Sequence, residues 1–341
     1  GGLGSKLSIP IALVTEARVR EDSEPSKHSR DLDMTTPDQA ECIRRILERV
    51  ADEVVIFNDL TQFASAASSL NDWIIWPHWN GARNRNRTAQ VAMICEVHSL
   101  RYVGPDPYAR LIANDKSLTK HFLRQAGLLT PDSIFIATPE QLSLIESLTP
   151  PFIIKPNMEG SSIGIDAHSI AFTSQDAKSL ALAALRNFPE GVIAEQFVEG
   201  PEVFIAVSFD RHNRYRCGAT ERIVKDEPDF LHRDVYDYSL KFSDAREVIL
   251  RSSDILTDGL LKNIIRMTET LQTIDLIRVD GRLRNGEFCV IEITPDPLMT
   301  PDSEFLGSLL LAGHETDDIL RDIIERVAAK TPSLQSSNLG K

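Results

Sequence analysis

Two acidic residues near the C-terminal end of the chain stand in a pattern typical of a β-hairpin. The segment 276–300 reads LIRVDGRLRNGEFCVIEITPDPLMT, and two apolar runs in it flank Asn285-Gly286. This dipeptide between alternating runs is a strong short-range signal for two antiparallel strands. Asp280 lies in the first predicted strand and Glu292 in the second, so the hairpin would bring two carboxylates together.

The register of the hairpin decides whether these carboxylates share a face. Alternation puts Arg278 beside Asp280 on one face of the first strand, and Glu292 beside Thr294 on one face of the second. A two-residue turn would separate the two acids, whereas a three-residue loop with Gly286 in the left-handed region would bring all four side chains to one face. We predict the three-residue loop. The alternative is a hairpin with an ordinary solvent-facing polar side.

A second group of polar residues could bind phosphate. Lys155 ends an apolar run before a proline, and Gly160, Ser161 and Ser162 follow closely. Small residues let backbone amides and hydroxyls close on phosphate oxygens, although a flexible turn explains the same letters. Lys116 stands at the start of a predicted helix, where the dipole disfavours a cation, so we expect its charge to act outside that helix.

Composition limits the classes of protein to which the chain can belong. Its 341 residues are 42% hydrophobic and 26% charged, and 37 basic against 50 acidic residues give a net charge of −13. These values predict a soluble protein of two or three domains, with neither nucleic acid nor membrane as a partner. Four single cysteines indicate neither a zinc site nor a disulfide framework, which favours a reducing cytoplasm. They are Cys42, Cys95, Cys217 and Cys289.

Alternating strands and helices predict the domains. Strand-like runs at 8–14, 53–57 and 73–76, with helices after Thr36 and from about residue 88, indicate a parallel α/β domain at 6–104. We expect an α+β domain at 105–191, with a helix from about Ser117 to Gln125. A second α+β domain at 192–330 would contain two long antiparallel strands, the hairpin and a final helix. Residues 331–341 are predicted to be a tail.

Taken in order, six segments resemble one known superfamily. They read NDKSLTK, KPNMEGSSIG, AEQFVEGPEVFIAV, YDYSLKF, RVD and IEITPDPLMTPDS. Their order and spacing resemble those of the ATP-grasp superfamily and, within it, the D-alanine–D-alanine ligase family. The resemblance covers most of the chain. It implies a three-domain ATP-grasp fold in which an N-terminal parallel α/β domain precedes two α+β domains that clamp ATP.

The same resemblance implies where ATP binds. The two lysines would hold its phosphates under the serines, a glutamate and a valine would meet adenine, a second glutamate would meet ribose, and a third lysine would reach the γ-phosphate. These positions are Lys116, Lys155, Ser161, Ser162, Glu195, Val198, Glu202 and Lys241.

For catalysis, the resemblance implies an ADP-forming ligase that joins a carboxylate to an amine through an acyl phosphate. Asp280 and Glu292 would hold two Mg²⁺ ions, and Arg278 would stabilise charge on the transferring phosphoryl group and on the tetrahedral oxyanion. Ser303, at a predicted helix start, would bind a substrate carboxylate. His78 is a candidate for orienting substrate, although it could equally be a packed histidine.

Departures from the family pattern fall on the substrate side. Thr294 replaces a metal-binding asparagine, and Asp296, on the same strand parity, is a candidate substitute. Leu298 replaces the glycine whose amide faces the oxyanion. Glu304 replaces a leucine, and its charge would repel an α-carboxylate and could receive an amine. Phe242 replaces a frequent tyrosine, which leaves ester formation open.

In the first domain, the family's glycine-serine-glutamate loop is missing, and Glu16 and Glu21 are the acidic candidates nearby. Arg83, Arg85 and Arg87 stand where the family has acids. They fit either a solvated loop or a site for an anionic substrate.

From these features we expect a ligase acting on a small-molecule carboxylate and amine other than the D-alanine pair, with ATP and Mg²⁺ as cofactors. The family often forms dimers, so a homodimer is part of the expectation. The alternatives are an authentic cell-wall D-alanine–D-alanine ligase and a degenerate module that binds ATP without turnover.

Overall fold

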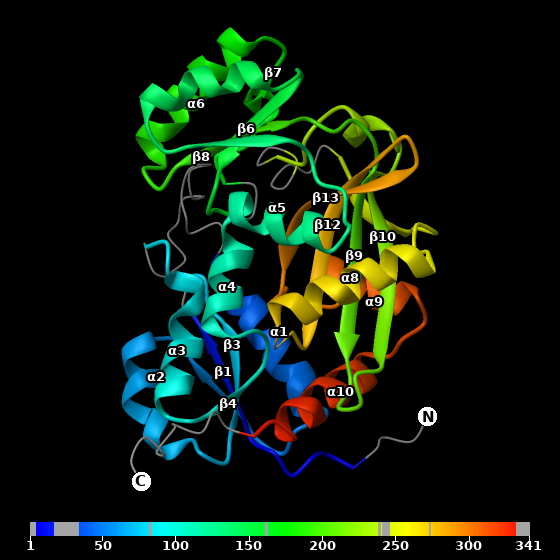
Figure 1. Cartoon of the computed structure of the whole chain (residues 1–341). Coiled ribbons are helices and arrows are strands. Elements are labelled where there is room, and N and C mark those ends of the chain that lie inside the picture. The colour runs from blue at the N-terminus through cyan, green and yellow to red at the C-terminus, as the bar shows by residue number, and fades with distance from the viewer. Residues whose placement is uncertain are drawn as a thin grey trace.

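The computed structural model places three β-sheets in the part of the chain that it describes (Figure 1). The described residues are 5–16, 34–81, 84–160, 163–237, 240, 246–272 and 274–331.

The first sheet is parallel, as predicted, with strand order β2-β1-β3-β4. Its strands are β1 (Ile11–Thr15), β2 (Val54–Phe57), β3 (Ile74–His78) and β4 (Arg101–Tyr102). The accompanying helices are α1 (Pro37–Glu48), α2 (Leu60–Ala66) and α3 (Gln90–Val97). Helix α1 begins at the predicted cap, where Thr36 Oγ1 accepts the Gln39 N–H at 3.2 Å and the Gln39 side chain accepts the Thr36 N–H at 3.0 Å.

A second sheet, with order β5-β8-β6-β7, is antiparallel. Its strands are β5 (Ser133–Ile136), β6 (Phe152–Pro156), β7 (Ile170–Ala171) and β8 (Val192–Gln196). Helix α6 (Ser174–Asn187) packs on it, together with a 3-10 helix at Pro139–Ser147. Between the first two sheets lie α4 (Pro107–Asn114), which we did not predict, and α5 (Lys116–Gln125), which we did (Figure 1).

The third sheet is also antiparallel and has the order β11-β10-β9-β12-β13. Its strands are β9 (Glu202–Phe209), β10 (Tyr215–Val224), β11 (Val248–Ser252), β12 (Leu276–Arg284) and β13 (Glu287–Thr294). Helix α8 (Asp258–Leu271) packs on one face, in a core that includes Ile205 and Val207 of β9. Helix α9 (Glu304–Leu311) packs on the other face, in a core that includes Ala206.

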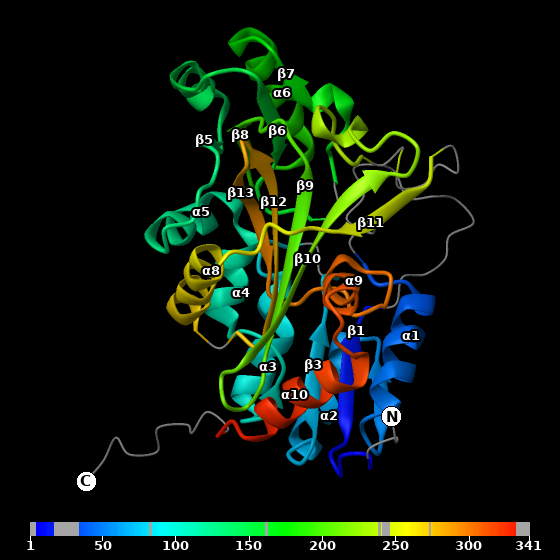
Figure 2. The same cartoon turned by 90° about the vertical axis from the view of Figure 1, so that its right-hand side faces the viewer.

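Helix α10 (Thr316–Ala328) packs against the first sheet, although it follows the third sheet in the sequence. Its apolar side, including Ile319 and Ile323, shares a buried core with Ile11 and Leu13 of β1. Figure 2 shows α10 crossing beside β1 and β3. The final helix therefore ties the end of the described chain to the first sheet. The domain bounds 6–104, 105–191 and 192–330 stay a prediction.

The predicted three-residue loop of the hairpin is wrong. Asn285 and Gly286 both have positive φ, 53° and 83°, and Arg284 pairs with Glu287, so the turn has two residues. The register then shifts between Asp280 and Gly281, where a β-bulge leaves one extra residue on β13. Beyond the bulge the pairing continues in a different register.

Because of this bulge, Asp280 lies directly opposite Glu292, and Arg278 lies opposite Thr294. Directly paired residues share a face of a sheet. The predicted common face is therefore confirmed, although the bulge, and not a longer loop, produces it.

We expect Gly218→Ala to lower the free energy of unfolding by about 1–3 kcal/mol, because a new side chain overpacks a filled site. A Cβ on Gly218 in β10 would lie 2.1 Å from the backbone oxygen of Ser308 in α9. The matched control is Gly259→Ala in α8, where the nearest atom would be 4.0 Å away. Urea unfolding measures both variants, and equal effects would contradict the close packing of α9 on β10.

Candidate active site

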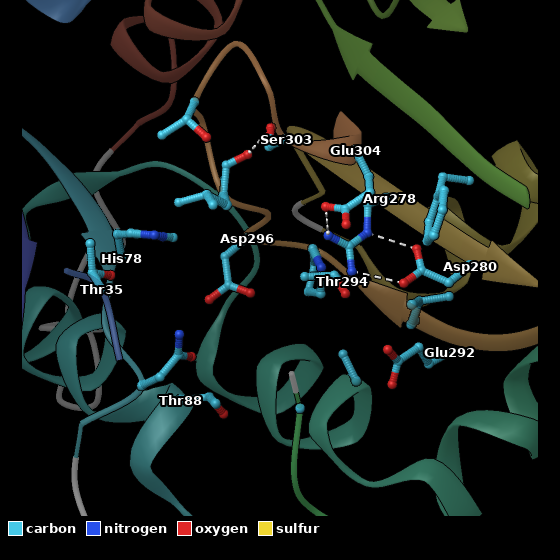
Figure 3. A pocket seen from close by; sticks show the side chains of 18 of the residues that line it. Thr35, His78, Thr88, Arg278, Asp280, Glu292, Thr294, Asp296, Ser303 and Glu304 are labelled. Carbon is cyan, nitrogen blue, oxygen red and sulfur yellow. Dashed lines mark hydrogen bonds and ion pairs between the residues drawn. The ribbon is translucent and has the colours of Figure 1, made fainter. Parts of the chain in front are cut away.

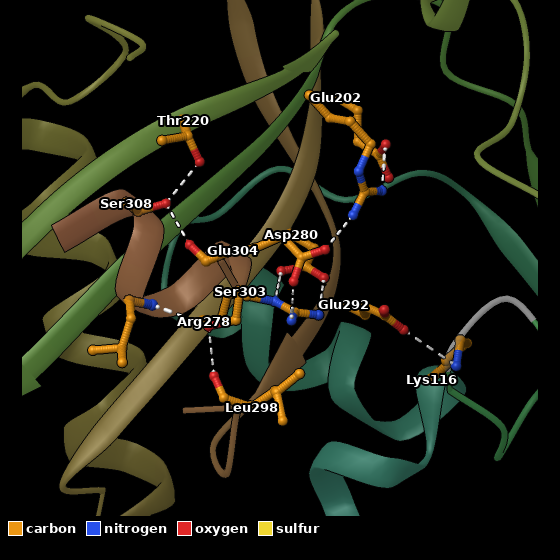
Figure 4. Close-up of polar contacts among 12 residues, drawn as sticks. Lys116, Glu202, Thr220, Arg278, Asp280, Glu292, Leu298, Ser303, Glu304 and Ser308 are labelled. Atoms are coloured by element: carbon orange, nitrogen blue, oxygen red, sulfur yellow. Dashed lines mark hydrogen bonds and ion pairs between the residues drawn. The ribbon is translucent and has the colours of Figure 1, made fainter. Parts of the chain in front are cut away.

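The carboxylate pair of the hairpin is surrounded by cations (Figure 4). Arg278 donates from Nε and Nη2 to the two oxygens of Asp280, both at 2.7 Å. The ammonium of Lys116 lies 3.3 Å from Glu292 Oε2. Each acid therefore has its own cation, and the two acids face each other across β12 and β13. We call the surface formed by these four side chains the carboxylate wall.

The two carboxylates have different pKa shifts. Burial raises the pKa of Asp280 to about 6, and the charges of Glu292 and Glu304 act in the same direction, while Arg278 opposes them. Burial also acts to raise the pKa of Glu292, but Lys116 and other cations outweigh it and lower that pKa. Asp280 is therefore the acid of the pair that takes up a proton more readily.

This donor set fits Mg²⁺. The ion prefers hard oxygen ligands and keeps several water or phosphate ligands, so two protein carboxylates are enough for it. The described residues contain no group of three or more His, Cys, Asp or Glu side chains able to hold a metal. Asp296, a weak candidate ligand, accepts a hydrogen bond from Arg110 Nη1 at 3.0 Å. Asp280 and Glu292 are the residues that would hold the ion, and Thr294 and Asp296, which line the same cavity as both, stay weaker candidates.

On the nucleotide side, a buried ion-pair cluster joins three elements. Lys155 of β6 donates to Glu195 Oε1 of β8 at 2.7 Å, and Lys120 of α5 lies 2.5 Å from Glu195 Oε2. Burial acts to raise the pKa of Glu195, but the two lysines outweigh it and lower that pKa. Lys120 lies in a segment that carries the family resemblance, but we predicted no role for it.

A cavity of about 130 Å³ lies next to this cluster. Lys155, Glu195, Val198 and Glu202, all predicted to bind nucleotide, line it. Lys116 also lines it, and its ammonium donates to the backbone oxygen of residue 159 at 2.6 Å. The charge of Lys116 thus points away from its own helix, as expected.

A larger cavity, of about 610 Å³, extends from the hairpin toward the first sheet (Figure 3). Thr35, His78 and Thr88 line it from the side of the first sheet. Thr294 and Asp296 line it from the hairpin side. The two cavities share residues of the carboxylate wall, so a nucleotide and a small molecule could meet there.

The start of α9 lies at one side of the larger cavity. Ser303 caps this helix: its Oγ donates to Leu298 O at 2.8 Å and accepts the Leu306 N–H at 3.3 Å. The hydroxyl predicted to bind a substrate carboxylate is therefore already used within the protein. The next residue, Glu304, points toward the carboxylate wall (Figure 3).

Two arginines hold Glu304. Arg278 Nη1 donates to its Oε2 at 3.2 Å, and Arg222 Nη2 donates to its Oε1. Arg222 also donates to Glu202 Oε2 at 2.9 Å and lies over the rings of Phe204 and Tyr236. The glutamate that we expected to repel a carboxylate is thus held in ion pairs with two protein cations. Arg222 was not among the predicted site residues.

Two of the predicted candidates of the first domain, Glu16 and Arg87, make contacts within the protein. Glu16 is buried and accepts the backbone N–H groups of Thr35 at 2.7 Å and Asn80 at 3.0 Å. Arg87 is buried in an ion pair with Glu159 at 3.0 Å. Through these contacts Glu16 and Arg87 stabilise the structure around the larger cavity.

The remaining predicted positions differ from these two. Arg85 is exposed, which fits the predicted alternative of a solvated loop. Six positions lie outside the described residues: Glu21, Arg83, Ser161, Ser162, Lys241 and Phe242.

We expect the ion pairs of Glu304 to stabilise the fold in a pH-dependent way. Burial acts to raise the pKa of Glu304, but Arg278 and Arg222 outweigh it and lower that pKa to about 2. A lowered pKa stabilises the fold above the ordinary value of about 4.5, and this contribution is lost as the pH falls toward 2. The shift corresponds to about 3 kcal/mol.

The variant Glu304→Gln tests this expectation. The difference in free energy of unfolding between wild type and E304Q should be largest at pH 7 and should shrink as the pH falls below about 4.5. Glu315, which is exposed at the start of α10 and makes no side-chain cap, provides the control E315Q. Urea unfolding between about pH 3 and pH 7 measures the difference, and a value independent of pH would contradict the ionised pairing.

Comparisons with known proteins agree with this arrangement. Residues 125–325 match the family model described as D-ala D-ala ligase C-terminus. The chain is 31% identical over 261 residues to a D-alanine–D-alanine ligase of Verminephrobacter eiseniae, covering 74% of this chain and 75% of that protein. It is 28% identical over 210 residues to a D-alanine–D-alanine ligase of Aquifex aeolicus, covering 61% of this chain and 67% of that protein.

Solved structures show the same fold. A D-alanine–D-alanine ligase from Bacillus anthracis complexed with ATP superposes with a TM-score of 0.67 at 20% identity, over 95% of this chain and 98% of that one. A D-Ala:D-Ser ligase from Enterococcus faecalis superposes with a TM-score of 0.67 at 16% identity, over 94% of this chain and 100% of that one. None of the described helices has the length and apolar character needed to cross a membrane. The chain belongs to the D-alanine–D-alanine ligase family of ATP-grasp enzymes, which are ADP-forming ligases that use ATP and Mg²⁺.

Proposed function

We propose that this enzyme joins the carboxylate of one small molecule to the amine of another through an acyl phosphate, and that the pair is not two D-alanines. The observation that carries the proposal is the position of Asp280 and Glu292, which line both cavities. A nucleotide in the smaller cavity and a carboxylate in the larger one would have the carboxylate wall between them.

The reaction proceeds in two balanced steps. A donor carboxylate oxygen bonds to the γ-phosphorus of ATP, and the bond from that phosphorus to the bridging oxygen breaks, so ADP leaves with the electron pair. The amine nitrogen then bonds to the acyl carbon, the carbon–oxygen bond to phosphate breaks, and the nitrogen loses a proton. The products are an amide, ADP and phosphate. Both steps concentrate negative charge, which cations must offset.

In this proposal the nucleotide is held by five residues of the smaller cavity and by three positions outside the described residues. Two lysines bind phosphate oxygens, a glutamate and a valine meet adenine, and a second glutamate meets ribose. A third lysine reaches the γ-phosphate, while two serines close over the phosphates. In that order, the residues are Lys116, Lys155, Glu195, Val198, Glu202, Lys241, Ser161 and Ser162. Their support is the family's motif order, together with the cavity lining for those that are described.

The carboxylate wall would act on the reacting atoms. Asp280 and Glu292 would hold Mg²⁺, which when bound would offset the charge of the phosphates. Arg278 turns from Asp280 to the transferring phosphoryl group and then to the oxyanion. His78, which lines the larger cavity, is the candidate for orienting the donor, and the Ser303 hydroxyl keeps the start of α9 in place.

The altered substrate pair is supported by Thr294, Leu298 and Glu304, three departures from the family pattern that all line the larger cavity. The second candidate is an authentic D-alanine–D-alanine ligase, which the names of the relatives favour. Both candidates share the nucleotide side and differ in their substrates.

An assay with hydroxylamine separates the candidates. Hydroxylamine converts an acyl phosphate into a hydroxamate, so incubation with ATP, Mg²⁺ and a panel of carboxylates identifies the donor without knowledge of the acceptor. We expect hydroxamate and ADP with at least one carboxylate other than D-alanine. D-alanine as the best donor in this assay, and as the best acceptor when amines replace hydroxylamine, would establish the second candidate. ATP binding without any hydroxamate would indicate a degenerate module.

The remaining expectations concern assembly and location. We infer a cytoplasmic enzyme because its phosphate donor is ATP, and a homodimer because of the family resemblance. Light scattering of the purified protein tests the dimer, and a monomer at assay concentrations would contradict it.

A further inference from the structure

The start of α9 combines three features that would bind a substrate carboxylate in a cleft without Glu304. These are two guanidinium groups, those of Arg222 and Arg278, and the N-terminal end of an α-helix. Guanidinium groups bind carboxylates through paired N–H donors, and helix N-termini favour anions. The site lies on the larger cavity, which Ser303 and Glu304 line.

In this chain the carboxylate of Glu304 already occupies these groups. One of its oxygens accepts from Arg222 and the other from Arg278. Each guanidinium group also donates to a second protein carboxylate, Arg222 to Glu202 and Arg278 to Asp280. Figure 4 shows Arg278 together with Glu304, Asp280 and Glu202.

Hydrogen bonds at the start of α9 also hold Glu304 in this position. Ser303 Oγ is bonded to Leu298 O and to the Leu306 N–H, so the hydroxyl beside Glu304 makes both of these contacts within the protein. Further into the helix, Ser308 Oγ donates to Glu304 O at 2.6 Å and contacts the hydroxyl of residue 220 in β10 at 2.7 Å. These bonds fix the backbone of Glu304 against β10.

The local charge opposes a second anion. In the ion-pair cluster around Glu304, three cations, Arg222, Arg278 and Lys116, lie against four carboxylates. The four are Glu202, Asp280, Glu292 and Glu304. A substrate carboxylate brought to the arginines would meet Glu304 as a like charge, and displacing Glu304 would leave a partly buried acid unpaired.

We propose that Glu304 takes the place of a substrate carboxylate, so that the acceptor of this enzyme is an amine without an α-carboxylate, such as an amino alcohol, a simple amine or an amino-acid amide. This inference rests on the proposed ligase function. It makes Glu304 a specificity-determining residue of the acceptor site.

Matched acceptors test the proposal on the full chain with ATP, Mg²⁺ and the donor identified by the hydroxylamine assay. The acceptors are alanine, alaninamide and alaninol, each as both enantiomers. Because like charges at one site disfavour binding, we expect kcat/KM for alaninamide or alaninol to exceed that for alanine by at least about tenfold. Mass spectrometry of the product identifies the acceptor that reacted.

Two variants test whether Glu304 itself determines the acceptor preference. Glu304→Leu removes one carboxylate partner from each arginine and leaves Arg222 paired with Glu202 and Arg278 with Asp280. The preference for acceptors without a carboxylate should therefore narrow or reverse, by about tenfold or more. The control Glu315→Leu, on an exposed residue at the start of α10, should keep the wild-type ratio. A wild-type enzyme that prefers alanine overturns the proposal even if E304L does not fold, and so does an unchanged ratio in a folded E304L.

Failure of this inference is distinguishable from failure of the proposed function. Preference for acceptors with a free carboxylate, with ADP and amide still formed, contradicts only the role of Glu304. Absence of hydroxamate with every carboxylate contradicts the ligase proposal itself.

Discussion

Glu292→Gln is expected to lower phosphate release by at least about 10³-fold, equal to about 4 kcal/mol of activation free energy. The substitution keeps the shape of the side chain but removes the charge that faces Asp280. Lys116, which lies 3.3 Å from Glu292, would also lose its ion-pair partner. Steady-state release of phosphate under saturating ATP measures the effect.

The control for this variant is Glu287→Gln. Glu287 lies at the start of the same strand, next to the turn, and is exposed. Its substitution should leave the rate within about twofold, as is usual for a surface position far from special contacts. Near-normal turnover by E292Q, with ordinary dependence on Mg²⁺, would remove Glu292 from the proposed ion site.

Arg278→Lys is expected to lower kcat by about 10²–10³-fold with a smaller change in KM for ATP. Lysine keeps the positive charge but lacks the fork that binds both oxygens of Asp280 at 2.7 Å and also reaches Glu304. A point charge cannot hold two acids in that geometry. Rapid-quench measurement of ADP formation tests whether phosphoryl transfer itself is slowed.

Arg284→Lys is the matched control, because Arg284 ends the same strand and is exposed. It should react at the wild-type rate. If R278K also keeps its kcat, the role proposed for the guanidinium group in both steps is wrong.

The hairpin illustrates how far local sequence predicts a site. Alternation and Asn285-Gly286 correctly indicated two antiparallel strands. The bulge that aligns the acids was missed, although Gly281 inside β12 was a usable signal, because glycine within a strand often marks a bulge. A Cβ there would lie 2.4 Å from Cys289 O. The bulge depends on this close approach between strands, which local propensity does not describe.

Residues whose partners are distant in the sequence were harder to predict. Lys120 lies in a segment that carries the family resemblance, and Arg222 lies in a predicted strand. Their contacts with Glu195 and Glu304 exist only once separate elements pack together. By contrast, Lys116 was predictable, because a cation at the start of a helix has a local cost. Long-range ion pairs leave no comparable local signal.

Helix α4 was missed despite a local start signal. Asp106 caps it by accepting the Ala109 N–H at 2.9 Å, and Pro107 is its first residue. Gly104-Pro105 indicated a turn, and no helix was predicted between it and Ser117. We therefore predicted one helix where the structure has two. The second helix starts directly after its own cap at Asp115.

Transfer of oxygen from the donor carboxylate to phosphate tests the central claim most directly. The donor is labelled with oxygen-18 in both oxygens of its carboxylate and incubated with ATP, Mg²⁺, the acceptor amine and the enzyme, and the released phosphate is analysed by mass spectrometry. An acyl phosphate route breaks the bond between the acyl carbon and the transferred oxygen, so one labelled oxygen should appear in each phosphate formed. Phosphate that contains no label would contradict the proposed mechanism.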